Sequence, residues 1–245
     1  AYDDPDHALY NLSEAQKDAL VVTTDTALWG LQHSDHTTLN PDAGEDVDYM
    51  RRMFEEHHNP VDLKAICAYP DKMALLIDIY KQNPDKRIAM VVGFPHGHTS
   101  AEDAQKQMRE AVAQFREAGI ENPIDIDTVI PYHAWMDGDF DHVREIVRAE
   151  GETARELDVT WKAIVMSSVH AYADKNTHYG KDYFRSIYDA TMMVLDAGAD
   201  SAKTCTGQAA ARPYNHFVPA DVAYIYNMMP MFMALRDFNA ENDTS

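Results

Sequence analysis

The feature that most limits the fold of this chain is an alternation of short apolar runs with longer amphipathic stretches. Apolar runs lie at residues 63–68, 88–93, 124–130, 161–167 and 201–205, and a shorter one ends at Asp35. Stretches with an apolar period of three to four residues separate them, over 46–56, 71–82, 100–118, 139–157 and 181–197. Short strands that alternate with helices of ten or more residues indicate βαβ units and a parallel sheet.

The ends of the sequence predict two further helices. A sixth helix after the last strand spans about 219–235, and Pro230 is expected to kink or end it. Near the N-terminus, Ser13 is a suitable cap for a helix over 13–20. Two of the helices between strands are followed by Gly119 and Gly198, and glycine is favoured just past a helix end.

The length and composition fit one domain. The 245 residues are 45% hydrophobic and 25% charged, which is ordinary for a folded protein with a sizeable core. We therefore expect a single domain over 1–245, with a helical extension over about the first 30 residues. No internal repeat or low-complexity segment divides the chain.

The charge and the cysteines exclude several classes of protein. Forty-one acidic residues against 21 basic ones give a net charge of −20, which argues against nucleic acid or an anionic membrane as a partner. No apolar run reaches membrane-spanning length, and the acidic N-terminus does not resemble a signal peptide. Only Cys67 and Cys205 are present, so we expect a reduced, cytoplasmic protein. His96 and His98 lie in a predicted loop and are not expected to bind metal.

The polar residues of the strands gather toward their carboxyl ends. Asp35, Cys67, Asp127 and Lys203 all lie at or near such ends. Active sites form at this face of a (β/α) barrel, and ligands also bind there in a doubly wound sheet, so both architectures stay open. The lack of a Gly-x-Gly-x-x-Gly or Walker loop disfavours a nucleotide-binding fold.

Lys203 carries the most specific chemical expectation. Burial at a strand end disfavours the charged ammonium, so we expect its pKa to fall and a free amine to form near neutral pH. Free amines attack carbonyls and form Schiff bases. The alternative is a lysine that extends from the strand end to solvent.

Each of the other candidates also has a simpler interpretation. Asp127 and Asp35 can be hydrogen-bonding residues of caps or turns. Lys162, next to a predicted strand start, can face solvent, and Cys67 can be a small buried hydrophobe.

Six segments, in order, resemble the strand ends of the deoxyribose-phosphate aldolase family of class I aldolases. They are Asp35-His36-Thr37-Thr38-Leu39-Asn40, Ala65-Ile66-Cys67-Ala68-Tyr69-Pro70, Val92-Gly93-Phe94-Pro95-His96-Gly97, Asp125-Ile126-Asp127-Thr128-Val129-Ile130-Pro131-Tyr132, Trp161-Lys162-Ala163-Ile164 and Ala202-Lys203-Thr204-Cys205-Thr206-Gly207. The resemblance covers about residues 30–235. Each segment alone is weakly specific, but their common order is a strong signal.

The resemblance implies an α/β fold of the (β/α) TIM-barrel type and reversible cleavage of 2-deoxy-D-ribose 5-phosphate to acetaldehyde and D-glyceraldehyde 3-phosphate. It implies that Lys203 forms the imine, that Asp127 relays the proton through a water, and that Lys162 is an auxiliary cation. It also implies a pocket lined by Asp35 and Cys67. No cofactor or metal is required.

Further substrate contacts are expected from Thr206 and Gly207, but the family pattern is then lost. Gln208 stands where the family usually has a lysine that helps to hold the substrate phosphate. Only six of the eight βα units are evident, and the family's later lysine and phosphate-binding turns are not found. A completing partner chain, a homo-oligomer, a longer native chain or coverage by the N-terminal segment would each protect the open edges of the sheet.

The leading functional hypothesis is therefore a class I aldolase that takes a small aldehyde or sugar-phosphate substrate. One alternative is an aldolase of the same mechanism that uses an unphosphorylated aldehyde acceptor. The other is a non-catalytic barrel subunit that completes or regulates a partner chain.

Overall fold

The computed structural model describes residues 35–39, 46–55, 65–171, 176–206 and 225–242. Its six strands are β1 (Asp35–Thr37), β2 (Ala65–Ala68), β3 (Arg87–Val92), β4 (Ile124–Val129), β5 (Thr160–Ile164) and β6 (Ser201–Lys203). Its helices are α3 (Asp46–Glu55), α4 (Pro70–Ala74), α5 (Ile77–Gln82), α6 (Ala101–Glu117), α7 (Tyr132–Asp137), α8 (Phe140–Leu157), α9 (Tyr183–Asp196) and α10 (Ile225–Asn242), with a 3₁₀ turn at Val169–Ala171. The predicted N-terminal helix lies outside these residues.

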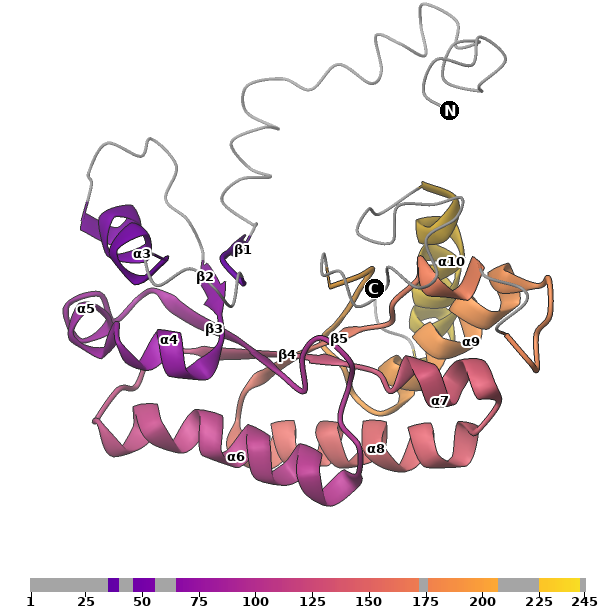
Figure 1. Cartoon of the computed structure of the whole chain (residues 1–245), viewed down its shortest axis with the longest axis horizontal. Helices are drawn as coiled ribbons and strands as arrows, with labels where there is room; N and C mark the ends of the chain where they lie inside the picture. The colour runs from indigo at the N-terminus through magenta and orange to yellow at the C-terminus, as the bar shows by residue number, and fades with distance from the viewer. Residues whose placement is uncertain (1–34, 40–45, 56–64, 172–175, 207–224, 243–245) are drawn as a thin grey trace, which may run out of the picture.

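The strands form one parallel sheet in the order β1-β2-β3-β4-β5-β6, so each strand pairs with the next one along the chain. In a doubly wound sheet the strand order would not follow the chain in this way, because it reverses at a switch point near the middle of the sheet. Figure 1 shows α6 and α8 side by side below the strands, with α9 and α10 following at one end. The sequential order is that of a (β/α) barrel, as predicted.

The sheet is curved, because its first and fifth strands come into contact. The Lys162 ammonium of β5 lies 2.5 Å from an Asp35 carboxylate oxygen of β1. In a flat sheet these strands, four positions apart, would be separated by roughly 19 Å, beyond the reach of a lysine and an aspartate. The curvature brings the inner sides of distant strands together.

The alternation of side chains along β3 shows how the two faces of the sheet differ. Ile88, Met90 and Val92 belong to the large cluster that packs the sheet against the helices. Ala89 and Val91 point the other way, into a small inner cluster. The helices thus cover the outer face, and the inner face is free to carry polar side chains from the neighbouring strands.

Helix boundaries follow the capping signals. Ser100 caps α6 by accepting a hydrogen bond from the Asp103 amide, and Asp139 caps α8 in the same way through the His142 amide. Gly119 and Gly198 follow α6 and α9 with φ of 74° and 98°, as expected for glycines just past a helix end.

Four details of the predicted elements were wrong. Asp35 begins β1 rather than ending a strand. The single helix predicted over 71–82 is divided into α4 and α5, because tight turns at Leu75 and Leu76 redirect the chain while Leu76 stays buried. The short helix α7, which ends at Gly138 with φ of 84°, was not predicted. The last helix, α10, extends to Asn242 rather than ending near residue 235, and Pro230 does not end it.

Helix α10 continues to Asn242 although Pro230 lies inside it. Proline removes one backbone hydrogen bond, but packing against the rest of the fold can compensate. Met231 and Ala234, which follow the proline, are buried, and α10 packs along α9. Tertiary contacts therefore outweigh the local helix-breaking tendency.

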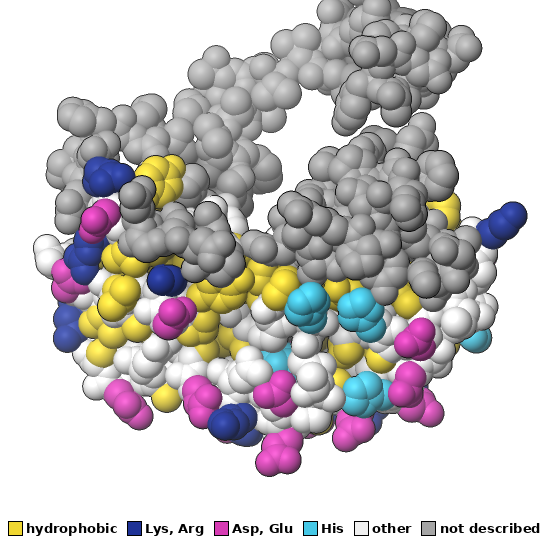
Figure 2. Space-filling view, viewed as in Figure 1, with side chains coloured by type: hydrophobic (Ala, Val, Ile, Leu, Met, Phe, Trp, Pro, Cys, Tyr) yellow, Lys and Arg dark blue, Asp and Glu magenta, His cyan; other side chains and the backbone are white. Residues whose placement is uncertain are grey.

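Acidic side chains are spread over the lower, helical side of the molecule, mixed with a few basic ones (Figure 2). None of the helices in the described part of the chain combines the length and the apolar content that crossing a membrane requires.

Candidate active site

The inner face of the curved sheet collects charged side chains from five strands. Three are acidic and three are basic, so their formal charges balance in a chain whose net charge is −20. The set is Asp35, Arg87, Asp125, Asp127, Lys162 and Lys203. Alternation along each strand explains why these residues share the inner face. This balanced cluster is the candidate site.

At the centre of the cluster Lys203 donates a hydrogen bond to Asp127. The Lys203 ammonium, at the end of β6, bonds Oδ2 of Asp127 on β4. The carboxylate is buried, whereas the lysine side chain is 33% exposed. Oδ1 of Asp127 is buried and has no hydrogen-bond partner among the described residues. The pair thus combines a cation open to solvent with a carboxylate that has a free acceptor.

The expected fall in the pKa of Lys203 is wrong for this structure. Burial lowers the pKa, but the charge and hydrogen bond of Asp127, together with the charge of Asp35, raise it, and the net pKa lies above its ordinary value. Burial at a strand end can be expected from the sequence, whereas the contact with Asp127, 76 residues away, cannot. Lys203 therefore rests as an ammonium ion whose proton is shared with a carboxylate.

The two carboxylates of the Asp-x-Asp pair differ sharply in their partners. Asp125 accepts a hydrogen bond from Arg87 and forms an ion pair with Lys162. Burial raises the pKa of Asp125, but these two cations lower it by more, so the net pKa lies below its usual value. Burial raises the pKa of Asp127, and its cationic neighbours offset this only in part. Asp125 is thus fixed as an anion, while Asp127 is suited to gain and lose a proton.

Lys162 lies in the interior and does not face solvent. Its ammonium bridges Asp35 at 2.5 Å and Asp125 at 2.8 Å, and its side chain is 11% exposed. Burial lowers the pKa of Lys162, but the carboxylates around it raise it well above the ordinary value. The structure thus brings Asp35 and Lys162 into the same cluster as Asp127 and Lys203.

Cys67 is packed and protonated. Its side chain belongs to the small inner cluster with Ala89 and Val91, and its sulfur lies 3.9 Å from Oδ2 of Asp127. Burial and the nearby Asp127 raise the pKa of the thiol far above its usual value. Its predicted role as a pocket-lining residue remains a prediction, but a thiolate is not available here.

The family comparison agrees with this geometry. A model of the DeoC/LacD family of aldolases matches residues 31–224, which is most of the chain and includes all six strands. The chain belongs to the DeoC/LacD aldolase family. It is therefore an aldolase, and by the chemistry of that family a lyase.

Solved structures that resemble this aldolase agree with the fold. A structure described as that of a "putative deoxyribose-phosphate aldolase" from Toxoplasma gondii ME49 covers 91% of this chain and 74% of that chain, with a TM-score of 0.63 and 14% identity. A structure described as "QR15, an Aldolase" covers 85% of this chain and 77% of that chain, with a TM-score of 0.59 and 18% identity. At these identities the likeness shows a shared fold of the TIM-barrel type.

The remaining predicted contacts of the aldolase lie just beyond β6. Thr206 follows Lys203 by three residues and is partly exposed. Gly207 and Gln208 lie outside the described residues. The predicted roles of both Thr206 and Gly207 stay predictions.

Arg87 and Glu150 are polar residues of the interior that the sequence did not single out. Arg87 begins β3 directly after Lys86, so in the sequence it looks like a solvent-exposed residue at the start of a strand. The only sequence signal for an inward direction is that Arg87 alternates with Ala89 and Val91, which point inward. Glu150 lies in a helix rich in acidic residues, yet it is fully buried under the sheet.

Glu150 forms a polar link between helix α8 and the strands on the outer face. His98 lies 2.7 Å from its Oε1, and Thr128 donates to its Oε2 at 2.9 Å. Trp161 in turn donates to Thr128 at 2.9 Å. His98 therefore serves the packing of the loop after β3, and no set of three or more histidine, cysteine or acidic residues in the described ranges could hold a metal ion.

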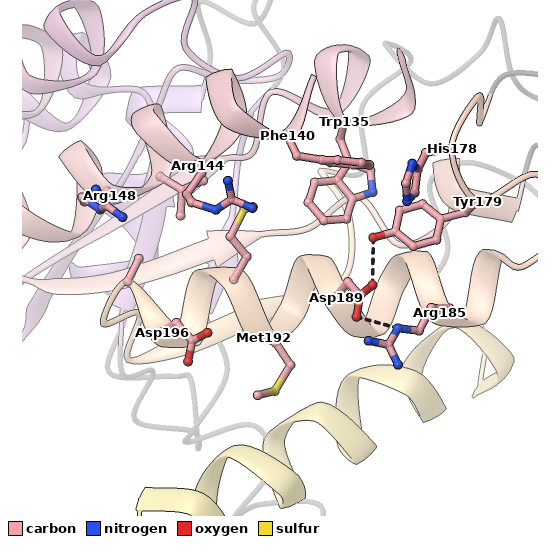
Figure 3. Close-up of a pocket in the computed structure, with 13 residues that line it drawn as sticks. Trp135, Phe140, Arg144, Arg148, His178, Tyr179, Arg185, Asp189, Met192 and Asp196 are labelled. Carbon is pink, nitrogen blue, oxygen red and sulfur yellow. Dashed lines mark hydrogen bonds and ion pairs between the residues drawn. The ribbon is translucent and has the colours of Figure 1, made fainter. Parts of the chain in front are cut away.

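A cavity of about 520 Å³ lies between α8 and α9, outside the sheet (Figure 3). Trp135 and Tyr179 line one part of it, and Asp189 accepts hydrogen bonds from Tyr179 and Arg185 at 2.8 Å. The arginines along it are spread out in the view and do not converge. None of the inner charged residues reaches this cavity.

Proposed function

We propose that the chain is a class I aldolase that cleaves 2-deoxy-D-ribose 5-phosphate to acetaldehyde and D-glyceraldehyde 3-phosphate through a Schiff base at Lys203. The observation that carries the proposal is the hydrogen-bonded pair of Lys203 and Asp127 inside the curved sheet of a DeoC/LacD family aldolase. A lysine, a proton acceptor beside it and an opening to solvent are what imine chemistry needs.

The first step requires a neutral amine, and the pair supplies it without an outside base. The proton of Lys203 moves along the existing hydrogen bond to Asp127, whose raised pKa favours this transfer. The amine then attacks C1 of the open-chain sugar. The carbinolamine loses its hydroxyl as water, with the proton returned by Asp127, and a protonated imine forms beside the restored carboxylate.

Cleavage follows from the charge of the imine. Asp127, directly or through a water, removes the proton of the 3-hydroxyl, and the bond between C2 and C3 breaks. Its electron pair flows into the protonated imine, which becomes a neutral enamine, and glyceraldehyde 3-phosphate leaves. Asp127 then returns the proton to C2, and water hydrolyses the imine to release acetaldehyde and Lys203.

Lys162 would act as a fixed cation in this scheme. It is the direct ladder partner of Asp127, but its ammonium bonds Asp35 and Asp125. Held in this way, it contributes positive potential that keeps the pKa of Asp127 from rising further. Its contribution is electrostatic and involves no covalent bond.

The inner cluster of charges does not favour a phosphorylated acceptor over an unphosphorylated one. The inner charges among the described residues balance, so they give no excess attraction to a dianion. An aldolase of the same mechanism with an unphosphorylated acceptor is therefore the second candidate. With Gln208 in place of the family's lysine, we expect 2-deoxyribose 5-phosphate to be cleaved slowly by the chain alone.

The test is turnover by the purified chain on 2-deoxyribose 5-phosphate and, separately, on 2-deoxyribose. We expect acetaldehyde from at least one substrate, its loss in Lys203→Met, and its retention in Lys81→Met, which changes an exposed lysine of α5. Cleavage of only the unphosphorylated sugar would favour the second candidate. No acetaldehyde from either substrate would overturn the proposal.

A further inference from the structure

Arg87 holds the buried carboxylate of Asp125 from the side opposite Lys162. Its Nε and Nη2 both donate to Oδ1 of Asp125, the former at 2.9 Å, and Nη2 also donates to the Thr160 hydroxyl at 2.6 Å. Oδ2 of Asp125 is left for Lys162, at 2.8 Å. Each oxygen of Asp125 therefore faces its own cation.

This arrangement lets Lys162 serve two carboxylates. Because Arg87 already compensates Asp125, the Lys162 ammonium also reaches Asp35 across the barrel, at 2.5 Å. The chain of contacts runs from Arg87 through Asp125 and Lys162 to Asp35, with alternating charge. It spans four strands and leaves Asp127 bonded to Lys203.

We propose that Arg87 is a positioning residue for the imine-forming pair: it fixes Asp125 and Lys162 and keeps the inner charges balanced around Asp127 and Lys203. The inference rests on the function proposed above and adds a residue that touches neither substrate nor Lys203. Arg87 acts through its charge and through the bonds that it makes to Asp125.

The sign of the effect follows from the groups around Lys203. Asp127 on β4 and Asp35 on β1 face it, and their negative charges favour its ammonium form, while Cys67 on β2 faces it as a neutral thiol. Asp125 lies on the same inner face as these groups and is compensated by its two cations. Loss of Arg87 changes the sum of the inner charges from zero to −1, so Lys203 should hold its proton to a higher pH.

The experiment compares variants that differ in the sum of the inner charges and measures how imine trapping at Lys203 depends on pH. Wild type, Arg87→Met, Asp125→Asn and the double variant are incubated with acetaldehyde and reduced with borohydride at a range of pH values. A unit charge roughly 12 Å away shifts a pKa by about one unit at an effective dielectric constant of about 20, and solvent screening reduces this for the partly exposed Lys203 side chain. We expect the pH midpoint of trapping to rise by about half a unit to one unit in Arg87→Met and to fall in Asp125→Asn.

The double variant and the controls separate charge from structure. The double variant restores the balance of charge, so we expect its midpoint to return close to that of wild type, and Arg87→Lys should also remain close to it. Arg109→Met is the matched control, because Arg109 pairs with Glu156 on the exposed surface of α6 and α8. Circular dichroism and thermal unfolding confirm that each variant is folded.

The outcomes distinguish the two proposals. If wild type gives no adduct, the imine at Lys203 is wrong. If wild type gives the adduct but the folded Arg87→Met protein keeps its midpoint or lowers it, the role of Arg87 is wrong. A rise that the double variant does not reverse would also overturn it, since a change of packing would then be the cause.

Discussion

Replacing Asp127 with asparagine separates the two influences on Lys203, burial and the neighbouring carboxylate. In the native protein burial lowers the pKa of Lys203, while the charge and hydrogen bond of Asp127 are the main influence that raises it, and the net pKa is raised. Asp127→Asn removes the second influence and leaves the first. The pKa of Lys203 should then fall below its ordinary value.

The size of the fall can be worked from the contact. An opposite charge within hydrogen-bonding distance shifts a pKa by about 1–3 units, and solvent screening reduces this for an exposed group. Since a third of the Lys203 side chain is exposed, we expect the midpoint of imine formation to fall by about 1–2 units. Turnover should nevertheless fall roughly 10²–10⁴-fold, because the proton acceptor is lost.

The assay is borohydride trapping with acetaldehyde across pH, read by intact mass, together with the rate of acetaldehyde release. Asp141→Asn is the control, since Asp141 pairs with Arg144 on the exposed side of α8. A midpoint that rises or stays unchanged in Asp127→Asn would refute the inference that Asp127 holds the proton on Lys203. Full turnover by this variant would refute the role of Asp127 as the proton acceptor.

Three further predictions concern the packing of the fold. The buried Cys67 thiol, with its raised pKa, should resist iodoacetamide in the native protein and react after unfolding in urea, as read by peptide mass spectrometry. Gly151→Ala should lower the free energy of unfolding by about 1–3 kcal/mol in urea titrations, because the new Cβ would lie 2.1 Å from the Ala197 carbonyl oxygen. Burial lowers the pKa of His170 from 6.5 to about 4, so the unfolded state binds a proton that the native state does not. The contribution of neutral His170 to the free energy of unfolding should be complete above pH 6.5 and should fall by roughly 3 kcal/mol between pH 6.5 and 4. Urea titrations at a series of pH values should show this dependence in wild type and its loss in His170→Gln.

The alternation of strands and helices could be predicted because its causes are local. Apolar runs mark the strands, and caps such as Ser100 and glycines such as Gly119 mark the helix ends. The family pattern then placed Asp127 and Lys203 at the same face of the sheet, on the fourth and the sixth strand. The errors arose where tertiary packing decided the outcome, as at Pro230, where contacts with α9 carry the helix past the proline.

The electrostatics of the site could not be predicted in the same way. Lys203 and Asp127 are 76 residues apart in the sequence, and Lys162 and Asp35 are 127 apart. The local sequence around each residue therefore does not indicate which partner it contacts. The direction of the pKa of Lys203 depends on such a partner, and burial alone gave the wrong sign. Arg87 was missed for the same reason, since its role is defined by Asp125 on another strand.

The most direct test of the imine is to map the site of the adduct in the native chain. The protein is reduced with borohydride in the presence of acetaldehyde, digested and analysed by peptide mass spectrometry. We predict a single modified lysine on the peptide that contains Lys203, with Lys162 unmodified. An adduct on Lys162 instead, or cleavage of substrate without any adduct, would contradict Lys203 as the imine-forming residue.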